Sequence, residues 1–262
     1  MTDFLLYVLA GAGVGFAIGV TGVGGGSLMT PLLLLFGFPL HVAIGTDLLY
    51  AAITKAGGAV AHARRSNVDW RLVRLLAAGS IPASLITAVA LNTLFGDPEA
   101  YAGLLTTALG AMLIVTALSI VLRGRFAAGA DAAQPHALRA WIDAHADAAT
   151  LVMGVLLGVC VTLSSVGAGA FGAAVLMLLY PALRTVRIIG TDVAHAVPLT
   201  LIAGLGHLAL GNVDFALLGA LIVGSLPAIW VGSRLGGVLP DGIMRPVLAA
   251  ILMGLGVKFA ML

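Results

Sequence analysis

The chain has 262 residues, of which 61% are hydrophobic and only 9% are charged, and its mean hydropathy is +1.13. About a quarter of the residues in a soluble domain are charged, so this composition excludes a soluble catalytic domain. The net charge of +2 reflects scarce charges rather than a basic surface for nucleic acid. We therefore predict an all-α polytopic membrane protein whose surroundings are lipid.

Ten apolar segments follow one another along the chain. The first lacks the basic start and the cleavage site of a secretory signal, so we expect it to be a retained helix. Two others, 27–37 and 170–181, are too short to cross the hydrocarbon as straight helices. The whole series is 4–20, 27–37, 42–63, 71–95, 101–122, 148–164, 170–181, 186–209, 214–234 and 244–261.

A glycine-rich stretch precedes each short segment, at 21–27 and at 164–169. The first is not a P-loop, because Gly26 is followed by Ser27 and Leu28 rather than by lysine. Glycine lets the backbone leave helical geometry, and unwound backbone at membrane depth persists only around a cavity or inside protein. We predict short broken or re-entrant helices whose positive ends face an anion; close helix packing is the alternative use of these glycines.

The chain contains an internal duplication. An offset of 145 residues aligns 45–83 with 190–228, with 14 identities in 39 ungapped positions. The identities include Gly-Thr-Asp, a histidine, Asn-Val-Asp and Gly-Ser-x-Pro, which shared apolarity cannot explain. We predict a first transmembrane repeat at 1–122 and a second at 148–262. The polar stretch 123–147 is the predicted cytoplasmic linker, with an interfacial helix around Leu138, Trp141 and Ile142.

The arginines predict how the repeats lie in the membrane. The loop after the third segment carries Arg64, Arg65, Arg71 and Arg74, whereas its counterpart at 208–219 carries no lysine or arginine. By the positive-inside rule the first loop is cytoplasmic and the second is not. The repeats then have inverted topology, and both termini are predicted on the outer side.

Four ionisable residues in the apolar segments are candidates for function, because charges inside a membrane are costly. Lys55 is the best candidate for an anion counter-charge, although pairing with Asp47 is an alternative. Asp47 and Asp192 follow Gly-Thr pairs and either carry a coupled proton or cap helix starts. His195, one turn after Asp192, either relays that proton or packs as a polar core residue.

The two Gly-Ser-x-Pro motifs predict helix breaks or kinks, because proline removes a backbone donor. The motif residues are Ser80 and Pro82 in the first repeat and Ser225 and Pro227 in the second. Their serines are candidate hydroxyl ligands if the breaks face the glycine loops; a plain kink is the alternative.

Enzyme signatures are absent from the sequence. It has no H-E-x-x-H zinc motif and no G-x-S-x-G nucleophile, and the lone Cys160 lacks a basic neighbour. We therefore expect no enzymatic activity, no metal and no cofactor. His62 and His207 lie near segment ends, which favours positions at the membrane interface.

These motifs resemble those of the TauE/SafE family, the sulfite exporter or toluene sulfonate uptake permeases of bacterial membranes. The resemblance rests on residues 22–26 with Pro31, on 43–46, on His62 with 67–70, and on the second copy. It covers the whole chain except 123–147. The second glycine cluster is weaker here, and Asp47 and Asp192 stand where the family commonly has a small hydroxyl residue.

The resemblance implies a secondary transporter of the bacterial cytoplasmic (inner) membrane that moves a small sulfur-containing anion, such as sulfite, a sulfonate or sulfoacetate. We expect export coupled to the proton gradient; a passive anion channel and a transporter of another small organic anion are the alternatives. A homo-oligomer is compatible with the sequence. The predicted substrate-binding residues are Gly24, Gly25, Gly26, Ser27, Thr46, Lys55, Ser165, Gly167, Gly169 and Thr191.

Overall fold

The computed structural model describes residues 2–21, 26–129, 136–235 and 241–261. All regular structure in these ranges is helical, which confirms the all-α prediction. The helices are α1 (Thr2–Thr21), α2 (Gly26–Leu35), α3 (Leu40–Arg64), α4 (Trp70–Ala90) with a π-helical turn at Leu91–Phe95, α5 (Pro98–Gly129), α6 (His136–Ser164), α7 (Ala170–Leu179), α8 (Thr185–Ala209), α9 (Phe215–Leu235) and α10 (Asp241–Ala260).

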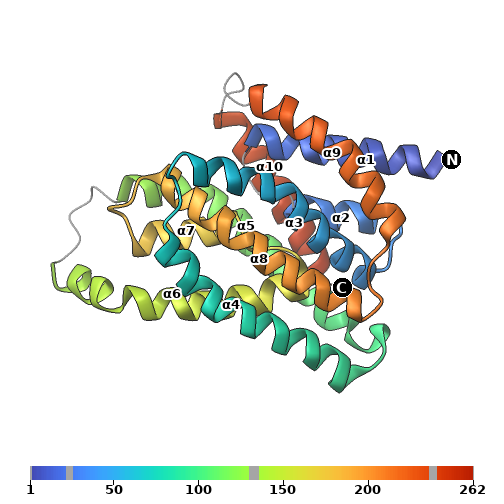
Figure 1. Cartoon of the computed structure of the whole chain (residues 1–262), viewed down its shortest axis with the longest axis horizontal. Coiled ribbons are helices and arrows are strands. Elements are labelled where there is room, and N and C mark those ends of the chain that lie inside the picture. The colour runs from blue at the N-terminus through green and yellow to red at the C-terminus, as the bar shows by residue number, and fades with distance from the viewer. Residues whose placement is uncertain (1, 22–25, 130–135, 236–240, 262) are drawn as a thin grey trace.

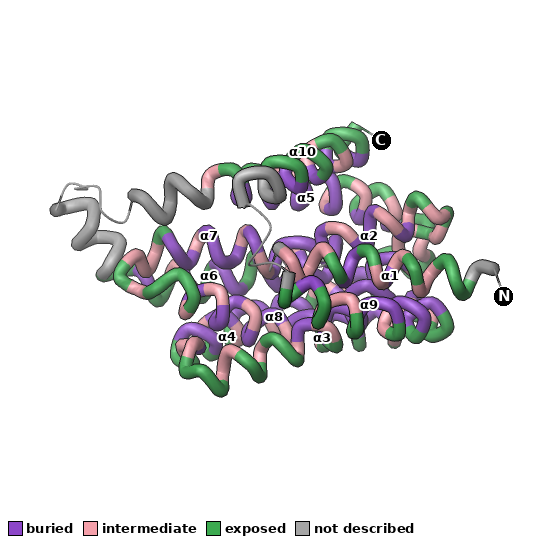
Figure 2. The backbone as a smooth tube through the Cα atoms, turned by 90° about the horizontal axis from the view of Figure 1, so that it is seen from above, coloured by how far each residue is buried: buried purple, intermediate pink, exposed green. Residues whose placement is uncertain are grey.

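The outer surface of the bundle is apolar. Among the described residues, 5 helices are long and apolar enough to cross a membrane by length and composition. Large aliphatic side chains point outward from them; Ile86 of α4, for example, is 68% exposed. Figure 2 shows exposed stretches along the outer sides of α4, α9 and α10, and buried stretches between the helices. Such a surface fits lipid and not water, so the chain is a multi-pass membrane protein.

The two short helices are confirmed. α2 and α7 have 10 residues each, which corresponds to about 15 Å of helix, whereas the hydrocarbon core is about 30 Å thick. Each follows a glycine-rich stretch, as predicted. Neither can cross the membrane alone.

Helix lengths repeat between the halves of the chain. α3 and α8 have 25 residues each, and α4 and α9 have 21 each. The packing also repeats, since α1 lies along α9 and, reciprocally, α4 lies along α6. α3 packs on its counterpart α8, and α5 on α10 (Figure 1). This exchange of equivalent helices is consistent with two inverted repeats.

The Gly-Ser-x-Pro motifs lie in these reciprocal contacts. A side chain at Gly79 of α4 would overlap the backbone of α6, and one at Gly224 of α9 would overlap the backbone of α1. The glycines therefore allow the close helix approach that holds membrane bundles together.

The predicted helix breaks at Pro82 and Pro227 are wrong. α4 continues through Pro82 and α9 through Pro227 without interruption. A proline interrupts few backbone hydrogen bonds, and a transmembrane helix tolerates it where neighbouring helices support it. Here α6 and α1 give that support directly at the motif.

The predicted linker is more helical than expected. α5 extends to Gly129 and α6 begins at His136, so Leu138, Trp141 and Ile142 belong to the 29-residue helix α6 rather than to a separate interfacial helix. The stretch is rich in alanine, the strongest helix former, and this extends both helices beyond their apolar parts.

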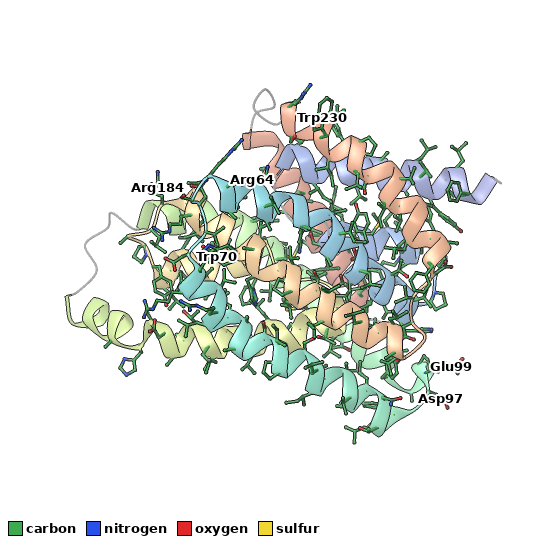
Figure 3. All side chains as sticks on the ribbon, viewed as in Figure 1. Arg64, Trp70, Asp97, Glu99, Arg184 and Trp230 are labelled. Atoms are coloured by element: carbon green, nitrogen blue, oxygen red, sulfur yellow. The ribbon has the colours of Figure 1, made fainter. Side chains whose placement is uncertain are left out.

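The two ends of the bundle differ in charge. Arg64, Arg184 and Trp230 lie at one end, and Asp97 and Glu99 at the other (Figure 3). We call these the basic end and the acidic end. The start of α1 and the end of α10 lie toward the acidic end (Figure 1).

Candidate functional site

The first carboxylate of the site is Asp47, in the middle of the bundle. Its side chain is 0% exposed, and its Oδ2 accepts a hydrogen bond of 2.5 Å from the Thr30 hydroxyl of α2. Ser165, in the glycine-rich stretch before α7, lies beside Asp47 with its hydroxyl facing the carboxylate. Two hydroxyl groups, one from each repeat, therefore surround this buried carboxylate.

The second carboxylate, Asp192, lies on α8 at the position equivalent to Asp47. It is 1% exposed, and a side chain at Gly172 of α7 would overlap its Oδ1. Gly172 therefore makes room for the carboxylate. Each aspartate thus faces the short helix of its own repeat, α2 or α7.

Neither aspartate caps a helix. The N-cap residue of α3 is Pro39 and that of α8 is Arg184, so both carboxylates lie two turns inside their helices. The alternative that Asp47 and Asp192 cap helix starts is therefore wrong, because α3 and α8 begin before the Gly-Thr-Asp motifs.

Lys55 lies within electrostatic range of both carboxylates. It is 9% exposed, and the charges of both Asp47 and Asp192 act on it. Its Nζ donates a hydrogen bond of 3.1 Å to the carbonyl oxygen of Ala168, in the glycine-rich stretch before α7. The lysine of the first repeat is therefore held against the broken backbone of the second.

His195 completes the cluster. Its Nε2 lies 2.8 Å from the Ser80 hydroxyl of α4, and both residues are 0% exposed. The charge of Lys55 also acts on this histidine. At the equivalent positions, Tyr50 lies beside Ser225. The serines of the two Gly-Ser-x-Pro motifs thus face equivalent positions on α3 and α8.

A cavity of about 300 Å³ adjoins this cluster. It follows one face of α3 from Lys55 past Gly58 to His62, that is, from the middle of the bundle toward the basic end. Gly169, the N-cap residue of α7, lines it with a φ of +139°, a conformation that favours glycine. The positive end of the α7 dipole therefore adjoins the cavity. The other lining residues are Ile18, Gly19, Thr54, Ala168, Ala170, Ala173, Ile189, Asp192, Val193, Ala196, Ile229 and Ser233.

Several predicted ligands lie outside this cavity. Thr46 and Thr191 are 0% exposed and bond to loops instead: Thr46 Oγ1 accepts from the N–H of Asp214, and Thr191 Oγ1 from that of Asp69. Gly167 faces Met112 of α5. Ser27 is buried at the start of α2 and does not line the cavity, and Gly26 is the first residue of α2. Gly24 and Gly25 lie outside the described residues.

Of the predicted residues, the structure brings together Lys55, Asp47, Asp192, His195 and Ser80 in one cluster, with Gly169 beside the cavity. Sequence reasoning missed Thr30, Ala168 and Gly172. Thr30 lies one turn after Ser27 in α2, so helical periodicity from the glycine stretch was the available signal.

A helical membrane bundle with two broken helices and a buried ionic cluster beside a cavity defines the class of protein: a membrane transporter. The family model described as sulfite exporter TauE/SafE matches residues 7–259. The chain belongs to this family.

Relatives with curated names agree with this class. The chain is 33% identical over 251 residues to the probable membrane transporter protein YjnA of Bacillus subtilis (strain 168), covering 96% of this chain and 97% of that protein. It is 32% identical to a probable membrane transporter protein of Xylella fastidiosa (strain 9a5c), covering 90% and 86%. It is 25% identical to the probable membrane transporter protein YdhB of Bacillus subtilis, covering 95% and 99%. No solved structure matches.

Proposed function

We propose that the protein is a secondary transporter that exports a small sulfur-containing anion, of the sulfite, sulfonate or sulfoacetate type, across the cytoplasmic membrane with proton coupling. The observation that carries the proposal is the position of Lys55, a buried cation beside the cavity and against the backbone that precedes α7. The family description, sulfite exporter, supports the class of anion.

The anion-binding part rests on charge and backbone. A buried ammonium group is costly unless opposite charge compensates it, and Asp47 and Asp192 supply that charge while they are ionised. Once a carboxylate takes up a proton, an anion in the cavity supplies the opposite charge in its place. The N-terminus of α7 adds the positive end of its dipole at the same place. An anion held between Lys55 and this helix end is stabilised from two sides.

The proton-coupling part rests on the two carboxylates. A bound anion repels an ionised Asp192, and protonation of that carboxylate removes the repulsion. The affinities for the anion and for the proton are therefore linked, and each ligand strengthens the binding of the other. Because the proton and the anion then move together, net export requires an outward anion gradient that exceeds the inward proton gradient.

The orientation follows from the arginines. With the basic end in the cytoplasm, as the positive-inside rule requires, the cavity extends toward the cytoplasm and both termini lie outside. The molecule then has the conformation that accepts an anion from the cell interior.

The test is efflux from proteoliposomes loaded with sulfite or with a small sulfonate, with and without a pH gradient. We expect saturable efflux whose rate changes with the gradient. Lys55→Ala should abolish it, whereas Lys258→Ala, which alters an exposed lysine near the end of α10, should not. Conductance without any uphill movement would instead identify a passive channel, and efflux indifferent to Lys55→Ala would overturn the proposed site.

A further inference from the structure

His62 of α3 and His207 of α8 occupy equivalent positions in the two repeats. Each lies two residues before the end of its helix. Each backbone carbonyl accepts a hydrogen bond of 2.9 Å, from the N–H of Asn67 in one repeat and from that of Asn212 in the other. The backbones are therefore alike, so a difference between the two imidazole rings reflects their surroundings.

The His207 ring is fully engaged at the acidic end. It is 0% exposed, and its Nε2 lies 2.9 Å from the carbonyl oxygen of Thr162 in α6. Its Nδ1 lies 3.3 Å from Asn212 Nδ2, which also donates to the Tyr101 hydroxyl at 2.9 Å. With Nδ1 accepting, Nε2 carries the proton and donates it to Thr162. This bond ties α8 to α6.

The His62 ring, in contrast, lines the cavity at the basic end. Its Nδ1 has no hydrogen-bond partner among the described residues. Across the cavity from α3 lie Ile18 and Gly19, near the end of α1. The pair α8 and α6 is therefore bonded at the acidic end, whereas the equivalent pair α3 and α1 is separated by the cavity at the basic end.

Gly19 is the counterpart of Thr162. Gly11 and Gly15 of α1 approach the backbone of α9 at Leu221 and Ser225, and α6 repeats this contact with Gly154 and Gly158 against Leu76 and Ser80. The same register places Gly19 where α6 has Thr162. Both residues lie two positions before the end of their helix, where carbonyls lack an intrahelical partner.

We propose that His62 and His207 are the two gates of the transporter and that they close in alternation. In this conformation the His207 bond to the Thr162 carbonyl closes the acidic end. In the opposite conformation His62 Nε2 donates to the carbonyl of Gly19 and closes the cavity at the basic end, while the bond of His207 opens. The proposal rests on alternating access within the proposed function, but it is independent of the substrate.

The experiment measures cavity accessibility without any substrate. Thr54→Cys, in a Cys160→Ser background, places a thiol on the cavity wall. Its rate of labelling by a membrane-impermeant maleimide is followed in inside-out membrane vesicles, with the exposed Thr185→Cys as the accessibility control.

We expect His207→Ala to slow labelling of Thr54→Cys about tenfold, because the inward-open state loses the bond that stabilises it. His62→Ala should not slow it. The double variant should label within about twofold of the parent rate, since each conformation then lacks one gate bond. Tyr101→Phe, a milder change, should act in the direction of His207→Ala and serves if that variant does not fold. An unchanged rate in His207→Ala and Tyr101→Phe, or a double variant as slow as His207→Ala, would overturn the proposal.

Discussion

The hydroxyl of Thr46 accepts a hydrogen bond of 3.1 Å from the backbone N–H of Asp214, which lies in the other repeat. Thr191 and Asp69 make the equivalent bond at 2.9 Å. The Gly-Thr-Asp motif of each repeat thus binds the Asn-Val-Asp motif of the other, and this pairing explains why both motifs occur twice.

Thr46→Val should therefore lower the stability of the fold rather than the affinity for the anion. It leaves the Asp214 N–H without its partner, which costs about 1–3 kcal/mol of unfolding free energy. Thr46→Ser keeps the hydroxyl and should cost less. Thermal unfolding in detergent checks this difference. Weakened anion binding in Thr46→Val at unchanged stability would instead make Thr46 a ligand of the anion.

The glycine of the same motif gives a second stability prediction. A side chain at Gly190 would overlap the Asn67 carbonyl oxygen, so Gly190→Ala should destabilise the protein by about 1–3 kcal/mol. Gly57→Ala is the matched control, because nothing lies within 4 Å of the added methyl group. The control should be neutral or slightly stabilising, since alanine favours helix by about 1 kcal/mol. Equal melting temperatures for the two variants would contradict the packing.

Substitutions at the two carboxylates should abolish proton coupling and leave movement of the anion intact. Asp47→Asn keeps an oxygen that can accept the Thr30 hydrogen bond but cannot titrate. We expect uptake driven by a pH gradient to fall at least about tenfold, while exchange of labelled for unlabelled anion continues. Asp97→Asn, at the exposed acidic end, is the control. Persistent pH-driven uptake in Asp47→Asn and in Asp192→Asn would remove both from the coupling step.

The membrane orientation is open to a direct check by thiol labelling. In a Cys160→Ser background, Glu99→Cys should react with an impermeant reagent added to intact cells, whereas Thr185→Cys should react only after the cells are opened. The opposite pattern would invert the proposed topology.

Hydropathy and repetition predicted most of the fold. The ten apolar segments correspond to α1–α10, and the short helices fall after the glycine stretches as expected. Hydropathy could not identify helix partners, because core-facing and lipid-facing residues are equally apolar in a membrane. The roles of Gly79 and Gly224 in helix packing therefore appear only in the structure, as do the uninterrupted helices at Pro82 and Pro227.

The candidate site was also predicted only in part, because a sequence pattern does not show which residues meet. Lys55, Asp47, Asp192 and His195 stood out because charged and ionisable groups are costly at membrane depth. The threonines stood out only by their repetition, which marks either a ligand or a fold contact, and here they form the fold contact. His207, expected at the interface, is fully buried because Thr162 and Asn212 satisfy its ring.

The most direct test of the anion site is equilibrium binding of sulfite and small sulfonates to the purified protein by calorimetry. The chain has two lysines, so Lys55→Met and Lys258→Met remove the same charge at the site and far from it. We expect saturable binding to the parent protein and to Lys258→Met, and at least about a hundredfold weaker binding to Lys55→Met. Parent-like affinity in a folded Lys55→Met protein would contradict the assignment of the buried lysine as the anion-binding group.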